Sequence, residues 1–575
     1  MSPKDQNKSF QNRILAFQIF LLLFIALIIL RLFIISVAQH PYYQALAEGQ
    51  HSFFEKLVPK RGEIFITDKY SSQPYVVAGN LEENMVYAVP KEVQDPAGTA
   101  ARLAQILNLD EGTLQQKLSD QSKWYEPIMH QLTDSQSSQI QQAKLAGIYL
   151  DPEDVRYYPQ GNFLSQVIGF LGYKNNGVDK TGLYGLERYF NNDLSGIPGT
   201  ITTQSQSGNW ITDNNRYFTP ATNGDSLLLT IDRSIEYKAE SALAADVQKH
   251  GADSGAVIVA NPKTGAILAM ANYPGFDPNQ YGKVSSPSVY QNLATVETYE
   301  PGSTMKGVTM AGALQLGLIT PDSIYTDTGV VNIDGYKIEN SDHRAHGLQT
   351  MSQVIDWSLN TGAIYVENLE GNDNFLNNLK KFGFGAPTNI DLPENVGNIS
   401  NLTSPNAPQV NFDTAAFGQG ITVTPIQMLT AYMAIANGGK LMQPYIVAAK
   451  ILPDGKTEKT EPKEIGQIIS PETATMDTEM LLDDVNNGYG KKAGVAGYDI
   501  AGKTGTAQVA KNGVYDPTDN IGSFVGFGPI EDPKFIMIVV INHPRDASFA
   551  ETTATPLFSN IAQFILDYYN LPPNH

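Results

Sequence analysis

The sequence predicts an α+β fold for the region from about residue 226 to the C-terminus. Short apolar runs typical of strands occur near both ends of this region, at 227–231, 256–259, 266–270, 523–527 and 535–541. The last four form two pairs, each separated by a turn segment that contains proline, so each pair predicts a β-hairpin. Helical patterning occupies 234–250, most of the chain between the hairpins, and 556–569. Strands at both ends with helices between them indicate a single sheet that joins distant parts of the chain.

Composition excludes several classes of function. The 575 residues include 39 Lys and Arg against 59 Asp and Glu, and the net charge of −20 argues against a nucleic-acid-binding surface. The chain has no cysteine, which excludes disulfides, zinc–thiolate sites and cysteine nucleophiles. Hydrophobic residues make up 42% of the chain, a share that supports packed cores over most of its length.

Residues 14–38 form an apolar segment, interrupted by Gln18 and Arg31, that is long enough to cross a membrane as a helix. At 1.5 Å per residue such a helix spans a hydrocarbon core of about 30 Å. Basic residues are more frequent before the segment than directly after it. This bias predicts that residues 1–13 are a cytoplasmic tail and that everything after about His40 lies outside the membrane.

A cleaved signal peptide is the alternative for this segment. Ser36-Val37-Ala38 resembles a small-residue cleavage site. However, the apolar stretch is longer than the roughly 7–15-residue core of a signal peptide, and Arg31 interrupts it. These two features favour an uncleaved single-pass anchor over residues 14–38.

The polar and mixed region 39–225 is predicted to be a separate domain. Apolar residues at helical spacing predict short amphipathic helices over 98–150, and the strand-like pieces 63–66 and 75–77 precede them. Residues 199–219 are rich in Thr, Gln, Ser, Asn and Gly, which marks a linker or an extended hairpin. The character of the chain changes near Ser226, so the second domain is expected to span 226–575.

Ser303 and Lys306 are candidates for a nucleophile and its base. They stand at the start of a segment, 305–319, that is apolar nearly all round and therefore predicts a buried helix. Their i, i+3 spacing puts them on one face of that helix. Burial lowers the pKa of a lysine, and a neutral amine beside a hydroxyl can activate serine without histidine. The alternative is a helix cap with a lysine that reaches solvent, and this spacing alone does not decide between the two.

Two further patterns each occur three times, and the surrounding sequence distinguishes one copy of each from the other two. The Ser-x-Asn pairs are Ser207/Asn209, Ser358/Asn360 and Ser404/Asn406, and the Lys-Thr-Gly segments begin at Lys180, Lys263 and Lys503. Ser358 follows an apolar helical face, whereas the other two serines lie in the linker and in a proline-containing loop. Lys503 lies in a predicted strand that starts at Tyr498, whereas the other two lysines lie in loops. Within that strand, Gly505 would let a ligand approach the backbone closely.

Taken in order, Ser303-x-x-Lys306, Ser358-x-Asn360 and Lys503-Thr504-Gly505 resemble the active-site signature of penicillin-binding proteins and serine β-lactamases. Seven further segments resemble class B penicillin-binding proteins: 260–265, 300–306, 417–425 and 501–508, and, from the family's pedestal domain, 60–64 with its "RG-x-I" start, 157–159 and 185–187. The chain departs from the family at 66–70, where an Asp-Arg-Asn-Gly-like turn is usual.

The resemblance implies a membrane-anchored fold with two outer domains. A single transmembrane helix is followed by an elongated, dimerisation-like pedestal domain (39–225) without catalytic function. A penicillin-binding transpeptidase domain (226–575) then has a central antiparallel sheet flanked by helices. The implied activity is that of a serine D,D-transpeptidase, which cross-links peptidoglycan stem peptides ending in D-Ala-D-Ala and is acylated and inhibited by β-lactams. No metal or organic cofactor is implied.

The resemblance also implies roles for the catalytic residues. Ser303 attacks the penultimate carbonyl of the stem peptide and forms an acyl-enzyme, and Lys306 is its base. Ser358, held by Asn360 near Lys306, relays a proton to the leaving amine. The leaving D-Ala is then replaced by an amine of a second stem peptide.

The third motif is implied to bind the substrate. Lys503 and the hydroxyls of Thr504 and Thr506 bind the terminal carboxylate, with Gly505 in the same strand. The backbone N–H groups of Ser303 and Thr506 form the oxyanion hole.

Within class B, the resemblance favours the division or spore-septum type over the elongation type. Glu300 before Pro-Gly-Ser, Asn360 in place of Asp, and Lys-Thr-Gly-Thr in place of Lys-Ser-Gly-Thr carry this distinction. The implied partners are a membrane glycosyltransferase and proteins of the division complex, with no nucleic acid. The implied location is the cell membrane, with the N-terminus cytoplasmic and the catalytic domain outside the cell.

Two alternative functions remain open. One is a hydrolase of the D,D-carboxypeptidase or β-lactamase type, which the large pedestal disfavours. The other is a non-enzymatic β-lactam sensor, which would need more than residues 1–13 on the cytoplasmic side. A metal site at His343 and His346 is disfavoured because two histidines three apart lack a third ligand at helical spacing.

Overall fold

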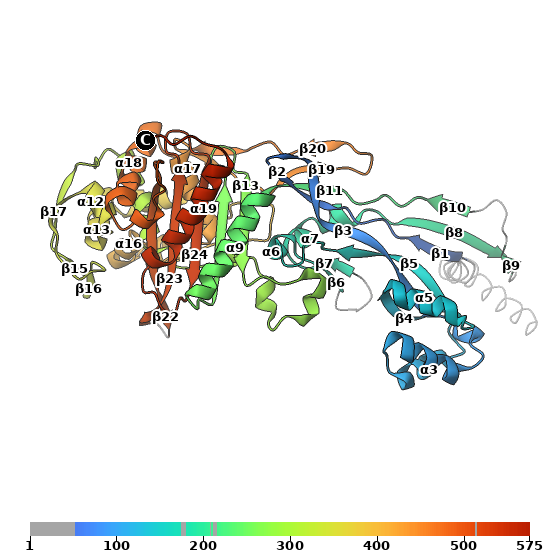
Figure 1. Ribbon diagram of the computed structural model, residues 1–575. Helices are drawn as coiled ribbons and strands as arrows, with labels where there is room; N and C mark the ends of the chain where they lie inside the picture. The colour runs from blue at the N-terminus through green and yellow to red at the C-terminus, as the bar shows by residue number, and fades with distance from the viewer. Residues whose placement is uncertain (1–51, 174–179, 207–208, 211–215, 512–513) are drawn as a thin grey trace, which may run out of the picture. The chain divides into compact units, whose positions relative to one another are not determined.

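The structure, a computed structural model, describes residues 52–173, 180–206, 209–210, 216–511 and 514–575 (Figure 1). The predicted anchor at 14–38 lies outside these residues. Within the described residues, no helix is long and apolar enough to cross a membrane. The described chain divides into two compact units, one formed by 52–59 with 196–223 and the other by 60–195 with 224–575.

The smaller unit is an antiparallel sheet built on strand β8 (Gly199–Gln206). β8 pairs with β1 (Ser52–Leu57) along one edge and with β10 (Arg216–Thr219) along the other, and β9 (Asn209–Trp210) pairs with the end of β8. The described strands at the two ends of the segment 199–219 therefore pair as an extended hairpin, which is one of the two structures expected for it.

The larger unit contains a mixed seven-stranded sheet in the order β20-β19-β11-β2-β3-β4, with β5 also paired to β3. Its strands are β2 (Ile64–Asp68), β3 (Ser71–Ala88), β4 (Glu126–Leu132), β5 (Ile148–Tyr157), β11 (Ser226–Asp232), β19 (Val447–Ile451) and β20 (Thr457–Lys459). β11 pairs in parallel with β2 and antiparallel with β19. Strands from both sides of the predicted boundary at residues 225 and 226 therefore share this sheet, and the boundary stays a prediction.

Three amphipathic helices pack beside β3, β4 and β5, within the region where the sequence predicts short helices. They are α3 (Pro96–Leu107), α4 (Glu111–Leu118) and α5 (Asp134–Ala143). Each begins where a side-chain oxygen accepts from a free backbone N–H: Asp95 caps α3, Asp110 caps α4, and Thr133 forms a capping box in α5. Their apolar faces contribute to one buried cluster together with residues of the sheet.

The centre of the larger unit is a five-stranded antiparallel sheet in the order β13-β12-β24-β23-β22. Its strands are β12 (Ser254–Ala260), β13 (Ile267–Tyr273), β22 (Ala501–Lys511), β23 (Val514–Gly528) and β24 (Phe535–Asn542). Both predicted hairpins are confirmed, because β12 pairs with β13 and β23 pairs with β24. Residues from the two ends of the domain meet where β12 pairs with β24.

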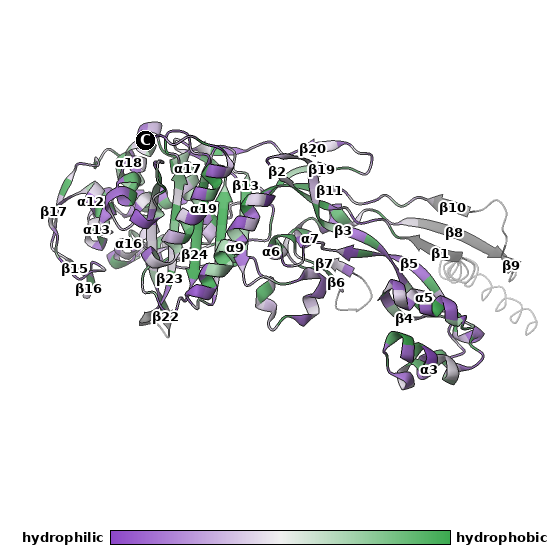
Figure 2. Cartoon of the chain, in the orientation of Figure 1, coloured by the Kyte–Doolittle hydropathy of each residue, from purple (hydrophilic) through white to green (hydrophobic). Residues whose placement is uncertain are grey.

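Helices cover both faces of this sheet. On one face, α9 (Arg233–Lys249) and α19 (Ala554–Tyr568) lie side by side (Figure 1). On the other face lie α11 (Met305–Gln315), α17 (Pro425–Ala436) and α18 (Pro471–Asn487). Every residue of β24 is buried, and alternate residues belong to the two different cores. This is why β24 reads as a continuous apolar run, visible as a green strand in Figure 2.

Two predicted boundaries were wrong. The helix that follows Ser303 ends at Gln315 and not at residue 319, because Gly317 adopts a left-handed φ of +68° that terminates it. Leu316 and Leu318 beyond this end are exposed. The strand predicted from Tyr498 begins instead at Ala501, because the Tyr498 N–H bonds to the Val495 carbonyl in a tight turn.

Shorter elements connect this framework. The helices are α6 (Ser165–Ile168), α7 (Gly185–Tyr189), α8 (Asn191–Ser195), α10 (Leu293–Val296), α12 (Met351–Asp356), α13 (Asn360–Glu370), α14 (Asn372–Lys381), α15 (Ser400–Thr403) and α16 (Gln409–Ala415). The strands are β6 (Leu171–Tyr173), β7 (Lys180–Gly182), β14 (Ile324–Asp327), β15 (Val330–Ile333), β16 (Tyr336–Glu339), β17 (Gly347–Thr350), β18 (Lys440–Met442) and β21 (Glu464–Gln467). Single 3-10 turns are η2 (Pro90–Glu92), η3 (Pro278–Lys283), η4 (Pro287–Tyr290), η5 (Gly302–Thr304), η6 (Lys491–Ala493) and η7 (Ala550–Thr552).

A buried ion triad joins distant segments of the first half of the chain. Glu187 is fully buried and accepts from Arg156 Nε at 2.6 Å and from Arg61 Nε at 2.7 Å. Burial raises the pKa of Glu187, but the two guanidinium groups outweigh this effect and hold it below its usual value. Arg156 also donates to the Gly62 carbonyl at 2.8 Å, so the triad anchors the segment that leads into β2.

We expect Glu187→Ala to lower the free energy of unfolding of this unit by ~3–5 kcal/mol, because two buried guanidinium groups lose their counter-charge. Urea midpoints measure the change. Glu458→Ala is the matched control: its partner Lys456 is 67% exposed and Glu458 is 52% exposed, and such a pair contributes at most about 1 kcal/mol. Equal midpoints for the two variants would contradict a stabilising role for the triad.

Candidate active site

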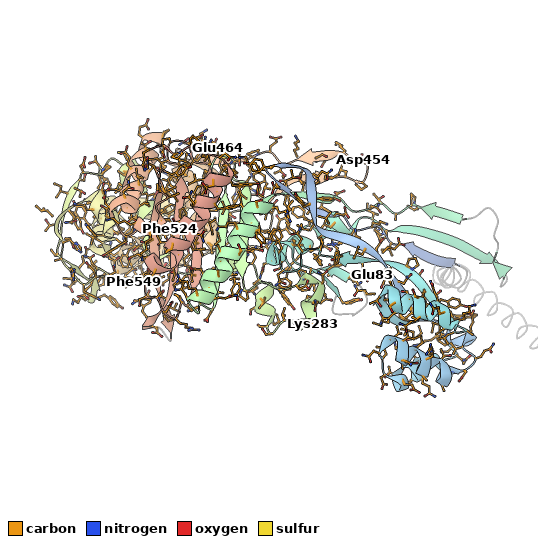
Figure 3. The ribbon with its side chains drawn as sticks, viewed as in Figure 1. Glu83, Lys283, Asp454, Glu464, Phe524 and Phe549 are labelled. Carbon is orange, nitrogen blue, oxygen red and sulfur yellow. The ribbon has the colours of Figure 1, made fainter. Side chains whose placement is uncertain are left out.

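A cleft of about 910 Å³ opens at the edge of the five-stranded sheet. Several parts of the chain line it. They include the turn that carries Ser303, the hairpin β15–β16, the turn between α12 and α13, α16 and the loop after it, the strands β22 and β23, and the loop after β24. Phe549 of that loop, labelled in Figure 3, is 50% exposed and lines the cleft. The cleft is lined by five of the residues singled out from the sequence, namely Ser303, Ser358, Asn360, Thr504 and Thr506.

Ser303 lies in the single turn η5 that leads into α11. Gly302, directly before it, has φ +57°, and a Cβ there would lie 3.0 Å from the Thr506 carbonyl oxygen. Glycine is therefore required for the turn to approach β22 this closely. The fully buried Tyr432 donates to the Thr304 carbonyl at 2.6 Å and holds the turn from the other side. Ser303 itself is half-buried at the cleft surface.

Lys306 is fully buried and contacts only uncharged oxygens. Its Nζ lies 3.1 Å from Ser303 Oγ, 3.1 Å from Ser358 Oγ, 2.5 Å from the Ser358 carbonyl oxygen and 3.0 Å from Asn360 Oδ1. Burial lowers the pKa of Lys306 well below its usual value, the charge of Lys503 adds to this effect, and Asp484 opposes it. A lowered pKa means that the neutral amine is populated at lower pH than for a lysine in water. The amine can therefore take the Ser303 proton.

Ser358 and Asn360 lie in the turn that joins α12 to α13. Ser358 has a left-handed φ of +51°, a conformation that non-glycine residues adopt rarely and at an energetic cost. This conformation turns both its hydroxyl and its carbonyl toward Lys306. Asn360 Nδ2 donates to the Glu339 carbonyl at 2.9 Å, which fixes its Oδ1 toward Lys306. The Ser-x-Asn pair is therefore held by a turn between two helices.

The Lys-Thr-Gly segment lies on β22 with its side chains alternating between two faces. Thr504 and Thr506 line the cleft, and Thr506 Oγ1 accepts from the Ala550 N–H at 3.1 Å. Lys503 is fully buried and is not among the residues that line the cleft, but its Nζ lies 3.1 Å from Thr504 Oγ1. Binding of the terminal carboxylate by Lys503 stays a prediction.

Gly505 also faces away from the cleft. A Cβ at this position would lie 2.8 Å from the Pro301 carbonyl oxygen and 2.9 Å from Thr304 Cγ2. The absence of a side chain thus lets the Ser303 turn pack on β22, which is a different reason from the one expected. Contact between Gly505 and the substrate stays a prediction. Because glycine has no side chain, only its backbone atoms could make that contact.

In the described part of the chain, the other copies of the Ser-x-Asn and Lys-Thr-Gly patterns do not approach the cluster of Ser303, Lys306, Ser358 and Asn360. Ser404 and Asn406 lie in an exposed turn after α15, and Lys180 is exposed on β7. Lys263 lies in the turn between β12 and β13, where it pairs with Asp532. Ser207 lies outside the described residues. His343 and His346 pair with Glu339 and Asp342, and the described residues contain no cluster of three or more potential metal ligands.

Asp484, which the sequence patterns did not single out, lies 3.4 Å from Lys503 Nζ. A signal for it was present. The buried positions of α18 recur at helical spacing and include Thr473, Ala474, Asp477, Met480, Leu481, Asp484 and Val485. An acid on the apolar face of a helix is unusual and calls for a partner.

Glu300 makes a second set of contacts near the cleft that the sequence did not indicate. Glu300 accepts from the Gly420 N–H at 3.0 Å and from the Tyr515 hydroxyl at 3.1 Å. Burial raises the pKa of Glu300, and these two donors act against that effect. Tyr515 lines the cleft, so Glu300 links the loop after α16 to the hairpin of β22 and β23.

Comparison with known families gives two matches that together cover most of the chain. Residues 255–563 match the penicillin-binding protein transpeptidase domain. Residues 56–229 match the penicillin-binding protein dimerisation domain. The residues of the cleft that were singled out from the sequence all lie in the first match.

Individual relatives cover nearly the whole chain. Stage V sporulation protein D of Bacillus subtilis is 34% identical over 99% of this chain and 87% of its own length. Peptidoglycan D,D-transpeptidase FtsI of Escherichia coli is 29% identical over 88% of this chain and 84% of its own length. The crystal structure of penicillin-binding protein 3 of Mycobacterium tuberculosis complexed with aztreonam has a TM-score of 0.69 and 25% identity. It covers 91% of this chain and 98% of its own.

We expect Lys306→Arg to fold and to slow the reaction of Ser303 with an activated ester. Arginine keeps the charge and cannot give up its proton, so it cannot act as a base. A positioned general base contributes roughly 10²–10⁴-fold to the rate. Stopped-flow release of the ester's leaving group measures the effect, and a rate within about threefold of the wild-type rate would exclude Lys306 as the base.

Proposed function

The chain belongs to the class B penicillin-binding proteins, and from this premise we propose that it is a serine D,D-transpeptidase that cross-links peptidoglycan through an acyl-enzyme on Ser303. The observation that carries this proposal is the hydrogen-bonded cluster of Ser303, Lys306, Ser358 and Asn360 at the floor of the cleft. Nucleophile and base are within hydrogen-bonding distance before any substrate is present. The activity agrees with the names of the relatives, which include a peptidoglycan D,D-transpeptidase.

Acylation follows from this geometry. Ser303 Oγ attacks the carbonyl carbon of the penultimate D-Ala while its proton passes to Lys306 Nζ. The peptide C–N bond then breaks, and Ser358, 3.1 Å from the same amine, passes that proton to the leaving D-Ala nitrogen. The N–H groups of Ser303 and Thr506 are proposed to stabilise the oxyanion.

Transfer completes the cycle without a cofactor. The neutral amine of a second stem peptide attacks the ester carbonyl, and the C–O bond to Ser303 breaks as a new amide forms. The proton lost by the attacking amine returns to Ser303 Oγ through Lys306. The terminal carboxylate of the first stem peptide is proposed to bind the hydroxyls of Thr504 and Thr506, which face the cleft from β22.

The proposal extends to the organisation of the chain. Residues 1–13 are a cytoplasmic tail, 14–38 a membrane anchor, 39–225 an elongated pedestal domain and 226–575 the transpeptidase domain. The apolar anchor segment and the basic residues before it support a cell-membrane location with the catalytic domain outside. The similarity to a stage V sporulation protein and to FtsI supports a role in division or in the spore septum, with a membrane glycosyltransferase and division proteins as partners.

Penicillin is expected to add one covalent equivalent to the protein, seen by intact-mass measurement, and Ser303→Ala is expected to abolish the addition. Ser404→Ala is the matched control, because Ser404 belongs to an exposed copy of the Ser-x-Asn pattern. Persistent labelling of Ser303→Ala would show that another residue is the nucleophile. Loss of labelling in Ser404→Ala would show that the wrong Ser-x-Asn pair has been chosen.

A chain that begins at about residue 40 is expected to bind penicillin normally but to fail to support cross-linking in cells. The anchor and pedestal raise the local concentration of nascent glycan strand at the active site. Replacement of 14–38 by an unrelated membrane helix tests whether helix packing with a partner is needed. Normal division of cells that carry the foreign helix would mean that the anchor acts only as a tether and that partners bind the pedestal.

A further inference from the structure

Lys503 has a buried carboxylate as its counter-ion, and the mechanism above gives that carboxylate no role. Lys503 Nζ lies 3.4 Å from each oxygen of Asp484, and both side chains have no exposed area. Nζ also donates to Thr504 Oγ1 at 3.1 Å. A buried lysine without a nearby negative charge tends to lose its proton. The state of Lys503 therefore depends on Asp484.

The end of α18 holds Asp484 in place. A Cβ at Gly488 would lie 2.4 Å from Asp484 Oδ1, and a Cβ at Gly490 would lie 2.8 Å from Oδ2. The backbone at both positions can approach the carboxylate only because both residues are glycine. The Gly490 N–H donates to the carboxylate. The two glycines and the helix thus fix the carboxylate beneath β22.

The hydroxyl of Thr504 connects the buried pair of Asp484 and Lys503 to the cleft. Its oxygen accepts from the Lys503 ammonium, which has only protons to donate. The Thr504 hydroxyl proton is then free to point away from Lys503 and into the cleft, where it can donate to an anion. Lys503 itself does not line the cleft, so this hydroxyl is its route to a ligand there.

We propose that Asp484 is a positioning residue of the transpeptidase, which holds the Lys503 ammonium against the Thr504 oxygen so that the Thr504 hydroxyl donates to the terminal carboxylate of the stem peptide. This proposal rests on the proposed function. It deepens that function by assigning the selectivity for a free carboxylate to three hydrogen-bonded side chains, those of Asp484, Lys503 and Thr504. Of these three, only Thr504 lines the cleft.

The other charged groups around the pair are consistent with this role. Burial raises the pKa of Asp484 to about 6, while Lys503 and the Gly490 N–H act against it, so Asp484 is ionised at neutral pH. Burial raises the pKa of Asp356 on α12 to about 8, and the neighbouring Asp483 and Asp484 add to this effect. Asp356 therefore keeps its proton at neutral pH and does not replace Asp484 as the counter-ion.

Two further groups face the pair from other elements. Glu551 on η7 lines the cleft; burial raises its pKa, and Lys503 and Lys492 act against that effect. Lys306 on α11 has its pKa lowered by the charge of Lys503. A protonated Lys503 thus also favours the neutral amine that Lys306 needs as a base.

Asp484→Asn tests the proposal, because it removes the charge and nearly preserves the volume. Asp477→Asn is the matched control: Asp477 lies two turns earlier on the same face of α18 and is equally buried, and neither of its oxygens has a hydrogen-bond partner among the described residues. The rate of penicillin labelling of Ser303 is measured for wild type and both variants from about pH 6 to about pH 10. Unfolding midpoints are recorded alongside.

We expect the alkaline fall of the labelling rate to move to lower pH by at least about one unit in Asp484→Asn, because an unpaired buried lysine loses its proton more readily. Asp477→Asn is expected to keep the wild-type profile. A profile for Asp484→Asn that matches Asp477→Asn and wild type would overturn the proposal. Failure of wild type to be labelled at Ser303 would instead overturn the proposed function, so the two failures are distinguishable.

If Asp484→Asn does not fold, a second variant tests the proposal. The double variant Asp484→Asn/Lys503→Met leaves neither charge buried alone and is expected to fold. It should be labelled equally fast by a β-lactam acid and by its methyl ester, whereas wild type should prefer the acid by at least about tenfold, the factor that corresponds to one charge-assisted hydrogen bond. A double variant that keeps the wild-type preference for the acid would also overturn the proposal.

Discussion

The burial of two lysines at one site is the constraint on which the rest of the catalytic domain depends. Lys306 and Lys503 are both fully buried. An amine removed from water is stable only if it loses its proton or gains a counter-charge. The protein uses one solution for each lysine. Lys306 contacts neutral oxygens and tends toward the free amine, whereas Lys503 lies beside the carboxylate of Asp484.

The central sheet supplies the rigidity that this division of roles requires. β22 carries Lys503, α11 carries Lys306 and α18 carries Asp484, and all three belong to one core that is packed against β24 through α17. A displacement of any of these elements by about one residue would turn its charged side chain away from its partners, because strand side chains alternate and helix side chains rotate with each step. The completely buried β24 and the helices on its two faces prevent such displacement.

Left-handed backbone conformations occur on both sides of the catalytic cluster. Gly302 and Ser358 both have left-handed φ values, one beside the nucleophile and the other beside the base. The glycine adopts this conformation without strain, whereas the serine adopts it at a cost of order 1 kcal/mol. The surrounding packing offsets that cost, since Leu359, which follows Ser358, is fully buried. In the first half of the chain, Glu187 and its two arginines use the same principle of buried charge, there to hold the segment that enters the mixed sheet.

The sequence by itself determined the hairpins, the order of the three motifs and the choice among their copies, because these depend on local periodicity and on residues near one another in the chain. It did not determine which side of β22 faces the cleft, that Ser358 lies in a turn between helices, or where the helix after Ser303 ends. Asp477 and Asp484 show the reason most directly. They occupy equivalent positions on the apolar face of one helix, and no local pattern distinguishes them. Only the packing of α18 against β22 gives Asp484 a lysine and leaves Asp477 without a hydrogen-bond partner, because contacts between segments distant in sequence are fixed by tertiary structure.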